Sequence, residues 1–242
     1  MTFYLIGLGL DKYSVPADAL KVLETCEEVY LETYTVNFPY DIEDLDGTLG
    51  IKIQKLERSD VEDESILKHA AEKNVALLVY GDCLSATTHM QLVMECKKRT
   101  ISYKVFNNSS IMTAVARAGL QLYKFGKTAS MPNWKEHTNK PTSFMNYVKG
   151  NSSIDAHTLL LTDIGLDFSS AIEQLKVACE REDVEIGKIV VVSMAGTDSQ
   201  KIHYGSFGEL AEKNVSLPFC IIIPGKLHFM EVESLQELCE KV

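Results

Sequence analysis

Short apolar runs alternate along the chain with stretches whose apolar residues recur every three or four positions. Runs of this kind that end at glycine or polar residues are typical of buried strands, and the longer period is typical of helices. The pattern predicts strands over residues 3–8, 29–31, 51–55, 75–80, 103–106, 158–162, 189–194 and 219–223. It predicts helices over residues 16–26, 59–72, 86–98, 110–118, 170–180 and 231–242, and loops over 37–50 and 131–141.

Alternating strands and helices indicate an α/β fold in which helices cover parallel sheets. The run over residues 75–80 is apolar at nearly every position, as a central parallel strand is. Ligands of such sheets bind beyond the carboxyl ends of the strands. We therefore expect the functional residues in the turns that follow strands, at residues 7–11, 81–88, 107–111, 162–165 and 195–198.

The composition narrows the classes of function. The 242 residues include 34 acidic and 24 basic side chains, and a formal net charge of −10 disfavours general binding of nucleic acid. Six cysteines form no C-x-x-C pair and the histidines are scattered, so we expect no metal site. The amino terminus lacks the basic region of a signal peptide, and no apolar run approaches the ~20 residues of a membrane span. We expect a cytoplasmic protein.

The first glycine-rich turn resembles a dinucleotide-binding loop only in part. Gly7 and Gly9 match two glycines of the G-x-G-x-x-G pattern, but Lys12 stands at the third. The acidic residue that the pattern needs after a second strand is absent unless Glu32 serves. We therefore reject a nicotinamide cofactor.

The turn over residues 81–89 is the richest in polar groups. Asp82 has two readings, as an acceptor for a ligand's ribose hydroxyls or ammonium group, or as a cap for the helix predicted near Ala86, which Ser85 also suits. A direct ligand contact predicts that Asp82→Asn weakens binding without changing stability. Cys83 lies in the same turn, but no nearby basic cluster favours a nucleophilic thiolate.

Six runs of the sequence resemble the diphthine synthase family. They are spread along nearly the whole chain, at residues 4–10, 30–35, 81–82 with 86–89, 110–112, 119–126 and 224–228. The run over 119–126, Gly-Leu-Gln-Leu-Tyr-Lys-Phe-Gly, is the most specific of these.

The resemblance implies a fold and an activity. The family is similar to the tetrapyrrole methylases, so it implies two α/β domains, residues 1–112 and 113–242 here, with S-adenosyl-L-methionine in a cleft between them. It implies a homodimer that methylates the 3-amino-3-carboxypropyl-histidine of translation elongation factor 2 during diphthamide biosynthesis and releases S-adenosyl-L-homocysteine. The acceptor is the amino group, and in eukaryotic members the carboxylate as well.

The family's cofactor contacts map onto eight positions of this chain. They are Leu10, Asp82, Ser85, Ser110, Ile111, Thr162, Ala195 and Phe219. The chain departs from the family pattern at Thr162, where leucine is usual, at Phe219, where histidine is usual, and at Cys83, where proline is usual. Contacts through backbone atoms tolerate such changes. No general base is identified.

Two alternative functions share the fold. A methyltransferase for small tetrapyrroles is disfavoured by the run over residues 119–126. A non-catalytic adaptor that binds the cofactor is disfavoured by the intact turns at Asp82 and at Ser110 and Ile111.

Overall fold

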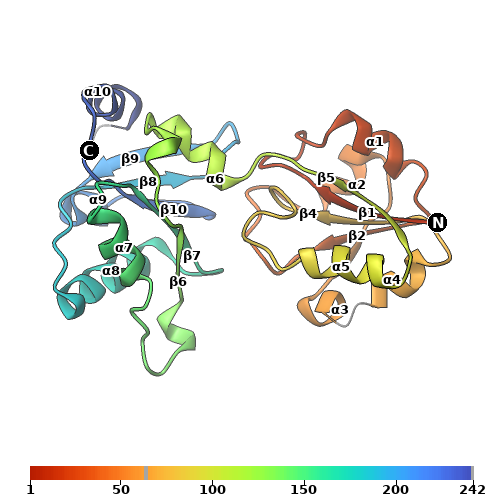
Figure 1. The fold of residues 1–242 in the computed structure, drawn as a ribbon. Coiled ribbons are helices and arrows are strands. Elements are labelled where there is room, and N and C mark those ends of the chain that lie inside the picture. Colours follow the sequence, from red (N-terminus) through yellow and green to blue (C-terminus); the bar gives the residue numbers. More distant parts are fainter. Residues whose placement is uncertain (63–64, 241–242) are drawn as a thin grey trace. The chain divides into compact units, whose positions relative to one another are not determined.

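A computed structural model describes residues 1–62 and 65–240. The chain divides into two compact units, Met1–Ile111 and Met112–Val242. Each unit contains its own five-stranded sheet with helices packed against it (Figure 1). The predicted α/β class is confirmed. Within the described ranges, no helix is both long enough and apolar enough to cross a membrane.

The sheet of the first unit has the order β3-β2-β4-β1-β5, and its paired strands all run parallel. Its strands are β1 (Thr2–Gly7), β2 (Glu28–Glu32), β3 (Gln54–Leu56), β4 (Val75–Val79) and β5 (Ser102–Phe106). All five residues of β4 are buried, which confirms its expected place inside the sheet. Because the strands are parallel, the turns that follow them meet at one edge.

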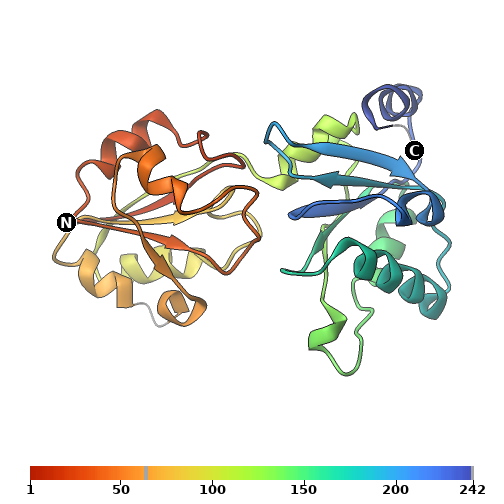
Figure 2. The ribbon, with the colours of Figure 1, turned by 180° about the vertical axis from the view of Figure 1, so that it is seen from behind.

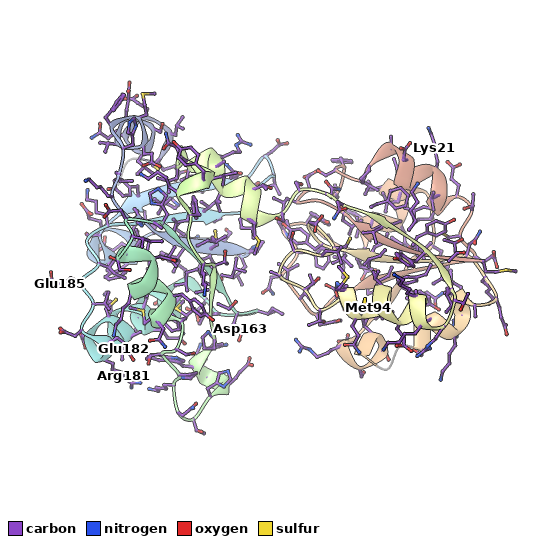
Figure 3. The ribbon with its side chains drawn as sticks, viewed as in Figure 1. Lys21, Met94, Asp163, Arg181, Glu182 and Glu185 are labelled. Carbon is purple, nitrogen blue, oxygen red and sulfur yellow. The ribbon has the colours of Figure 1, made fainter. Side chains whose placement is uncertain are left out.

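Helices cover both faces of this sheet. They are α1 (Ala17–Leu23), α2 (Asp44–Leu49), α3 (Arg58–Glu62), α4 (Ser65–Ala70) and α5 (Met90–Lys98). Side chains of β1 alternate between the two faces: Leu5 packs in the cluster that contains α4 and α5 residues, and Ile6 in the cluster that contains α1 and α2 residues. Met94 lies on the outer side of α5 and is half exposed (Figure 3).

The sheet of the second unit has the order β6-β7-β10-β8-β9. Its strands are β6 (Ala129–Met131), β7 (Thr158–Thr162), β8 (Ile189–Ser193), β9 (Lys201–Gly205) and β10 (Phe219–Ile223). Only β6 and β7 pair in parallel, whereas β10 is antiparallel to both of its neighbours and β9 to β8. The prediction of a parallel sheet is wrong for this unit. The chain turns back after β8, so β9 runs antiparallel beside it, and β10 also runs opposite to its neighbours β7 and β8.

The helices of the second unit begin with one whose first residue, Ile111, is the last residue of the first unit in the sequence. They are α6 (Ile111–Ala114), α7 (Met145–Ser152), α8 (Phe168–Glu182), α9 (Phe207–Ala211) and α10 (Phe229–Leu238), with 3-10 turns η1 (Val115–Ala118), η2 (Leu122–Lys124) and η3 (Trp134–Glu136). In both views α7 and α8 lie against one face of the sheet (Figures 1 and 2), where their apolar side chains share a buried cluster with its strands.

Several predicted boundaries are wrong. The helix predicted over 86–98 begins only at Met90, because Ala86 has a left-handed backbone with φ +57°. The loop predicted over 37–50 contains α2. The helix predicted over 59–72 is described as α3 and α4, with residues 63 and 64 outside the described part, and the last predicted helix begins at Phe229, with residues 241 and 242 likewise outside. β6, β9, α7 and α9 were not predicted.

Candidate functional site

Three turns meet at the carboxyl edge of the first sheet. Gly9 and Gly81 join the first two through reciprocal backbone hydrogen bonds of 3.0 and 2.9 Å. Gly81 has φ +74°, a conformation that glycine adopts without strain. A Cβ atom placed on Gly81 would lie 3.9 Å from Leu10 Cδ2 and 4.0 Å from Ser110 Cα. Leu10 and Ser110 therefore border the same small space.

The Asp82 carboxylate organises these turns. Its Oδ1 accepts hydrogen bonds from the Leu84 N–H at 3.0 Å and the Ser85 hydroxyl at 2.9 Å. Its Oδ2 accepts from Asn107 Nδ2 at 2.9 Å and from the Asn108 N–H at 3.0 Å. Burial opposes ionisation, but the four hydrogen bonds outweigh it, so the pKa of Asp82 lies below its usual value.

Neither reading of Asp82 from the sequence describes this arrangement fully. The carboxylate caps no helix at Ala86, because α5 begins at Met90. About four acceptor positions are available on a carboxylate, and four protein donors already point at them. Asp82 thus fixes the backbone of two turns at this edge of the sheet.

Asn108 completes the junction, a role that the sequence did not predict. Its Nδ2 donates to the backbone carbonyls of Gly7 at 2.9 Å and Ser14 at 2.8 Å. Its Oδ1 accepts from the N–H of Ser109 at 2.8 Å. Ser110 is buried, and Ile111, which is partly exposed, begins α6. In the sequence Asn108 belongs to the polar run Asn-Asn-Ser-Ser, and this run does not indicate hydrogen bonds to residues as distant as Gly7 and Ser14.

Cys83 is not a nucleophile in this structure. The side chain is fully buried and its thiol lies 3.6 Å from the carbonyl oxygen of Phe106 and 3.8 Å from that of Leu5. Burial raises the pKa of Cys83 to about 12, so the thiol stays protonated at neutral pH.

One edge of the second sheet brings together the three residues predicted there. β10 runs antiparallel to β7 and β8, so its first residue, Phe219, meets their carboxyl ends. The Thr162 hydroxyl donates to the Phe219 carbonyl at 2.8 Å. Ala195 lies two residues after the end of β8. Between them, the N–H of Met194 donates to the Pro218 carbonyl at 2.8 Å. The side chains of Ala195 and Phe219 are buried, so these positions offer mainly backbone atoms.

Two further polar residues shape this edge. Asp163, which follows β7 (Figure 3), accepts hydrogen bonds from the N–H groups of Asn133 at 3.1 Å and Ile164 at 3.0 Å. The Ser193 hydroxyl, at the end of β8, is buried and has no hydrogen-bond partner in the described part of the chain. A buried hydroxyl of this kind is a natural donor or acceptor for a ligand.

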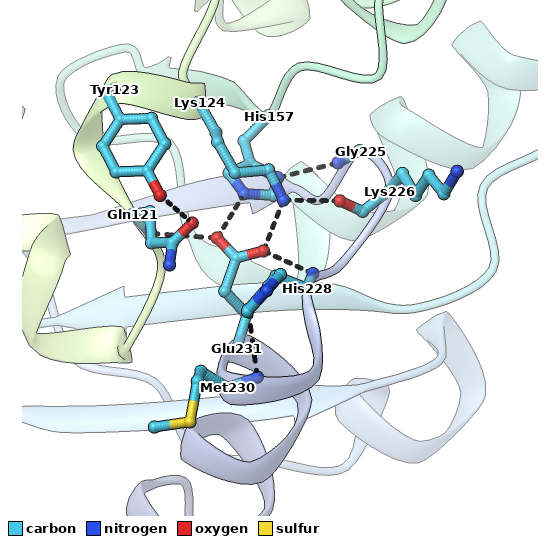
Figure 4. Close-up of polar contacts among 9 residues, drawn as sticks. All are labelled: Gln121, Tyr123, Lys124, His157, Gly225, Lys226, His228, Met230 and Glu231. Carbon is cyan, nitrogen blue, oxygen red and sulfur yellow. Dashed lines mark hydrogen bonds and ion pairs between the residues drawn. The ribbon is translucent and has the colours of Figure 1, made fainter.

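A second polar cluster lies where two runs of the family resemblance meet in the second unit (Figure 4). The carboxylate of Glu231 is fully buried. Its Oε1 accepts from the Gln121 N–H and from His157 Nε2, both at 3.0 Å. Its Oε2 accepts from Lys124 Nζ at 2.5 Å and from the His228 N–H at 2.8 Å. Burial opposes ionisation, but these bonds lower the pKa of Glu231 to about 2.

His157 has a defined tautomer in this cluster. Its Nδ1 accepts the N–H of Gly225 at 2.9 Å, so Nε2 carries the hydrogen that is donated to Glu231. Burial lowers the pKa of His157, which favours the neutral ring. Lys124 Nζ also donates to the Lys226 carbonyl at 2.6 Å. The cluster therefore fastens the run over 119–126 and the segment before α10 to the start of that helix.

The described residues contain no group of three or more histidine, cysteine, aspartate or glutamate side chains placed to hold a metal ion. Each unit offers instead backbone groups and short polar side chains at one edge of its own sheet.

Comparison with known proteins places the chain. The model of the tetrapyrrole (corrin/porphyrin) methylases matches residues 2–211. The diphthine synthase of Methanocaldococcus jannaschii is 40% identical, over 98% of this chain and 99% of that protein. The human diphthine methyl ester synthase is 36% identical, over 96% and 93%. The chain belongs to the diphthine synthase family of tetrapyrrole methylases.

A solved structure extends the likeness to three dimensions. A crystal structure of diphthine synthase superposes with a TM-score of 0.90 at 31% identity, covering 99% of this chain and 96% of that one. The resemblance expected from the short runs is thereby confirmed for the family and for the fold.

Proposed function

We propose that this chain is an S-adenosyl-L-methionine-dependent methyltransferase of diphthamide biosynthesis. Its substrate is the 3-amino-3-carboxypropyl-histidine intermediate on translation elongation factor 2. The observation that carries the proposal is the similarity to diphthine synthases, which extends along nearly the whole length of this chain and of each relative. We further propose that the enzyme is a homodimer and that it is cytoplasmic, a reducing compartment in which its six cysteines would stay free.

The proposed cofactor contacts are the eight positions to which the contacts of the family map. They are Leu10, Asp82, Ser85, Ser110, Ile111, Thr162, Ala195 and Phe219. The fit is supported by the space bordered by Leu10 and Ser110, and by the buried Ser193 hydroxyl without a partner. Asp82 makes its proposed contact through backbone atoms, because its carboxylate already accepts four hydrogen bonds from the protein and thereby fixes the turns.

When bound, the cofactor supplies an electrophilic methyl group on its sulfonium. The protein contributes mainly by holding the acceptor in line with that group, which can lower a barrier by about 7–11 kcal/mol. A neutral amine is the form that attacks, so an amine acceptor first loses its proton. A carboxylate acceptor needs no such step.

The first prediction concerns ligand binding to the purified protein. Saturating S-adenosyl-L-homocysteine, at about a hundredfold excess over Kd, is expected to stabilise the fold by ~2.7 kcal/mol through linkage. A thermal scan with and without the ligand measures this, with adenosine as the control for unspecific effects. An unchanged melting temperature would contradict the cofactor assignment.

The second prediction concerns selectivity for the acceptor. We expect label from the cofactor methyl group to enter elongation factor 2 that carries the aminocarboxypropyl group. Unmodified factor should remain unlabelled, because the added group supplies the nucleophile and a bare imidazole presents a different atom at a different depth. Equal labelling of both forms would refute the proposed substrate. Cofactor binding without labelling of either would favour the adaptor.

A further inference from the structure

A glutamate and a histidine from two of the family runs form a fully buried pair in the first unit. Glu32 is the last residue of β2, and His89 immediately precedes α5. Their side chains are 0% and 1% exposed, and Glu32 Oε2 lies 2.7 Å from His89 Nε2. The other oxygen of Glu32 accepts a hydrogen bond from the Thr35 hydroxyl. The pair thus links the end of β2 to the turn that follows β4.

The contacts of the pair point to one proton between its two atoms. His89 Nδ1 lies 3.2 Å from the carbonyl oxygen of Cys83, which can only accept, so Nδ1 carries a hydrogen. A neutral ring would then present a lone pair at Nε2 to a carboxylate 2.7 Å away, and these would repel. A proton between the two atoms removes the repulsion. Among the described residues neither atom makes a hydrogen bond, so this short contact is the polar contact that each of them has.

The turn that His89 holds has an unusual backbone. Ala86 has φ +57°, which is uncommon for a residue other than glycine. The Cys83 carbonyl accepts from the Thr87 hydroxyl at 2.9 Å as well as from His89. His89 occupies the position of a helix cap, but its side chain makes no cap bond. Its contacts are to the turn and to Glu32.

We propose that Glu32 and His89 are positioning residues that share one proton and hold the turn over residues 81–89 in the conformation that receives the cofactor. The same turn carries Asp82 and Ser85, so its backbone conformation decides how both are presented. The inference rests on the proposed function, and it adds a role for two residues that do not themselves contact the cofactor.

The same strand offers a matched control. Glu28, at the other end of β2, also contacts a histidine at 2.7 Å, through His69 Nδ1. It also binds Lys73 at 2.6 Å, but His69 and Lys73 are half exposed. Because β2 is parallel to its neighbours, this pair lies at the amino edge of the sheet, opposite the candidate site. Glu28→Ala therefore removes a similar pair from the same strand without touching the turns.

The experiment measures the Kd of S-adenosyl-L-homocysteine by calorimetry, together with melting temperature, for five proteins. They are the unaltered enzyme, Glu32→Ala, Glu32→Gln, His89→Ala and Glu28→Ala. Removing the tie is expected to raise Kd about tenfold in Glu32→Ala and His89→Ala, as when the competent turn is populated about one tenth of the time. Glu28→Ala should lower the melting temperature and leave Kd within about twofold.

Glu32→Gln is the variant that tests the shared proton. Its amide can donate to Nε2 of a neutral His89 while its carbonyl accepts the Thr35 hydroxyl, so we expect near-normal binding. If Glu32→Gln binds as weakly as Glu32→Ala, the proposal is overturned. Normal binding by a folded His89→Ala would also overturn it. If the alanine variants do not fold, His89→Gln is measured instead. Its side chain keeps a donor toward Glu32 and loses the contact to Cys83, and normal binding by this variant would overturn the proposal. Failure of the unaltered enzyme to bind would refute the proposed function itself.

Discussion

Replacing Glu231 by alanine is expected to lower the free energy of unfolding of the second unit by about 3–5 kcal/mol, as measured when one partner of a buried ion pair is removed. The carboxylate is fully buried and accepts four hydrogen bonds, one of them from the charged Lys124. Alanine would leave those donors without an acceptor and a poorly solvated ammonium without its counter-charge. Denaturant unfolding of the variant measures the loss.

A neighbouring glutamate provides the control for this prediction. Glu233 lies on the exposed side of the same helix, and Glu233→Ala should change the free energy of unfolding by no more than about 0.5 kcal/mol.

The pH dependence of the stability gives a second test of the role of Glu231. The folded pKa of Glu231 is lowered from 4.5 to about 2, so its stabilisation is present above pH 4.5 and is lost as pH falls toward 2. The deficit of Glu231→Ala should shrink over that window, and a constant deficit would show that the charge is unimportant.

Asp82→Asn is expected to reduce both stability and cofactor binding. The substituted amide keeps one acceptor oxygen, so in either orientation its NH₂ group faces a backbone N–H, that of Leu84 or that of Asn108. Each buried donor left without an acceptor costs about 1–3 kcal/mol. Loosening of the turns should also raise the Kd for S-adenosyl-L-homocysteine by about tenfold or more. Denaturant unfolding and calorimetry on the same protein measure the two effects.

The loss of stability differs from what the sequence predicted for a direct ligand contact, because the four protein donors were not foreseen. Glu95→Gln is a suitable control. Glu95 belongs to the same unit but pairs with Lys98 and Arg99 near the far end of α5. Surface pairs contribute only about 0–1 kcal/mol, and this one lies away from the turns, so binding should be unchanged. An Asp82→Asn protein with normal stability and normal binding would contradict the role assigned to this carboxylate.

The parallel sheet of the first unit could be predicted because each of its strands is marked by residues that are neighbours in the sequence. Strands such as β1 and β4 are short apolar runs closed by glycine, and parallel pairing follows from their alternation with helices. The same argument failed for the second unit. β9 carries Lys201, His203 and Tyr204 among its five residues, so it lacks the apolar run that marks a strand.

The roles within the site depend on contacts between residues distant in the sequence. Asp82 meets donors 25 and 26 residues further on. Glu32 and His89 lie on different family runs, and nothing in either run indicates that they touch. Phe219 reaches the edge near Thr162 only because β10 runs antiparallel. Residue types and turns were thus readable from the sequence, and the pairings between turns required the fold.

The most direct test of the central claim is the intact mass of elongation factor 2 after incubation with this enzyme and S-adenosyl-L-methionine. The factor should carry the aminocarboxypropyl group on its histidine, and a parallel sample should carry the unmodified histidine. We predict that the mass of the first rises by whole methyl increments and that the mass of the second does not change. An unchanged mass of the modified factor, with the cofactor demonstrably bound to the enzyme, would contradict the proposed methyl transfer.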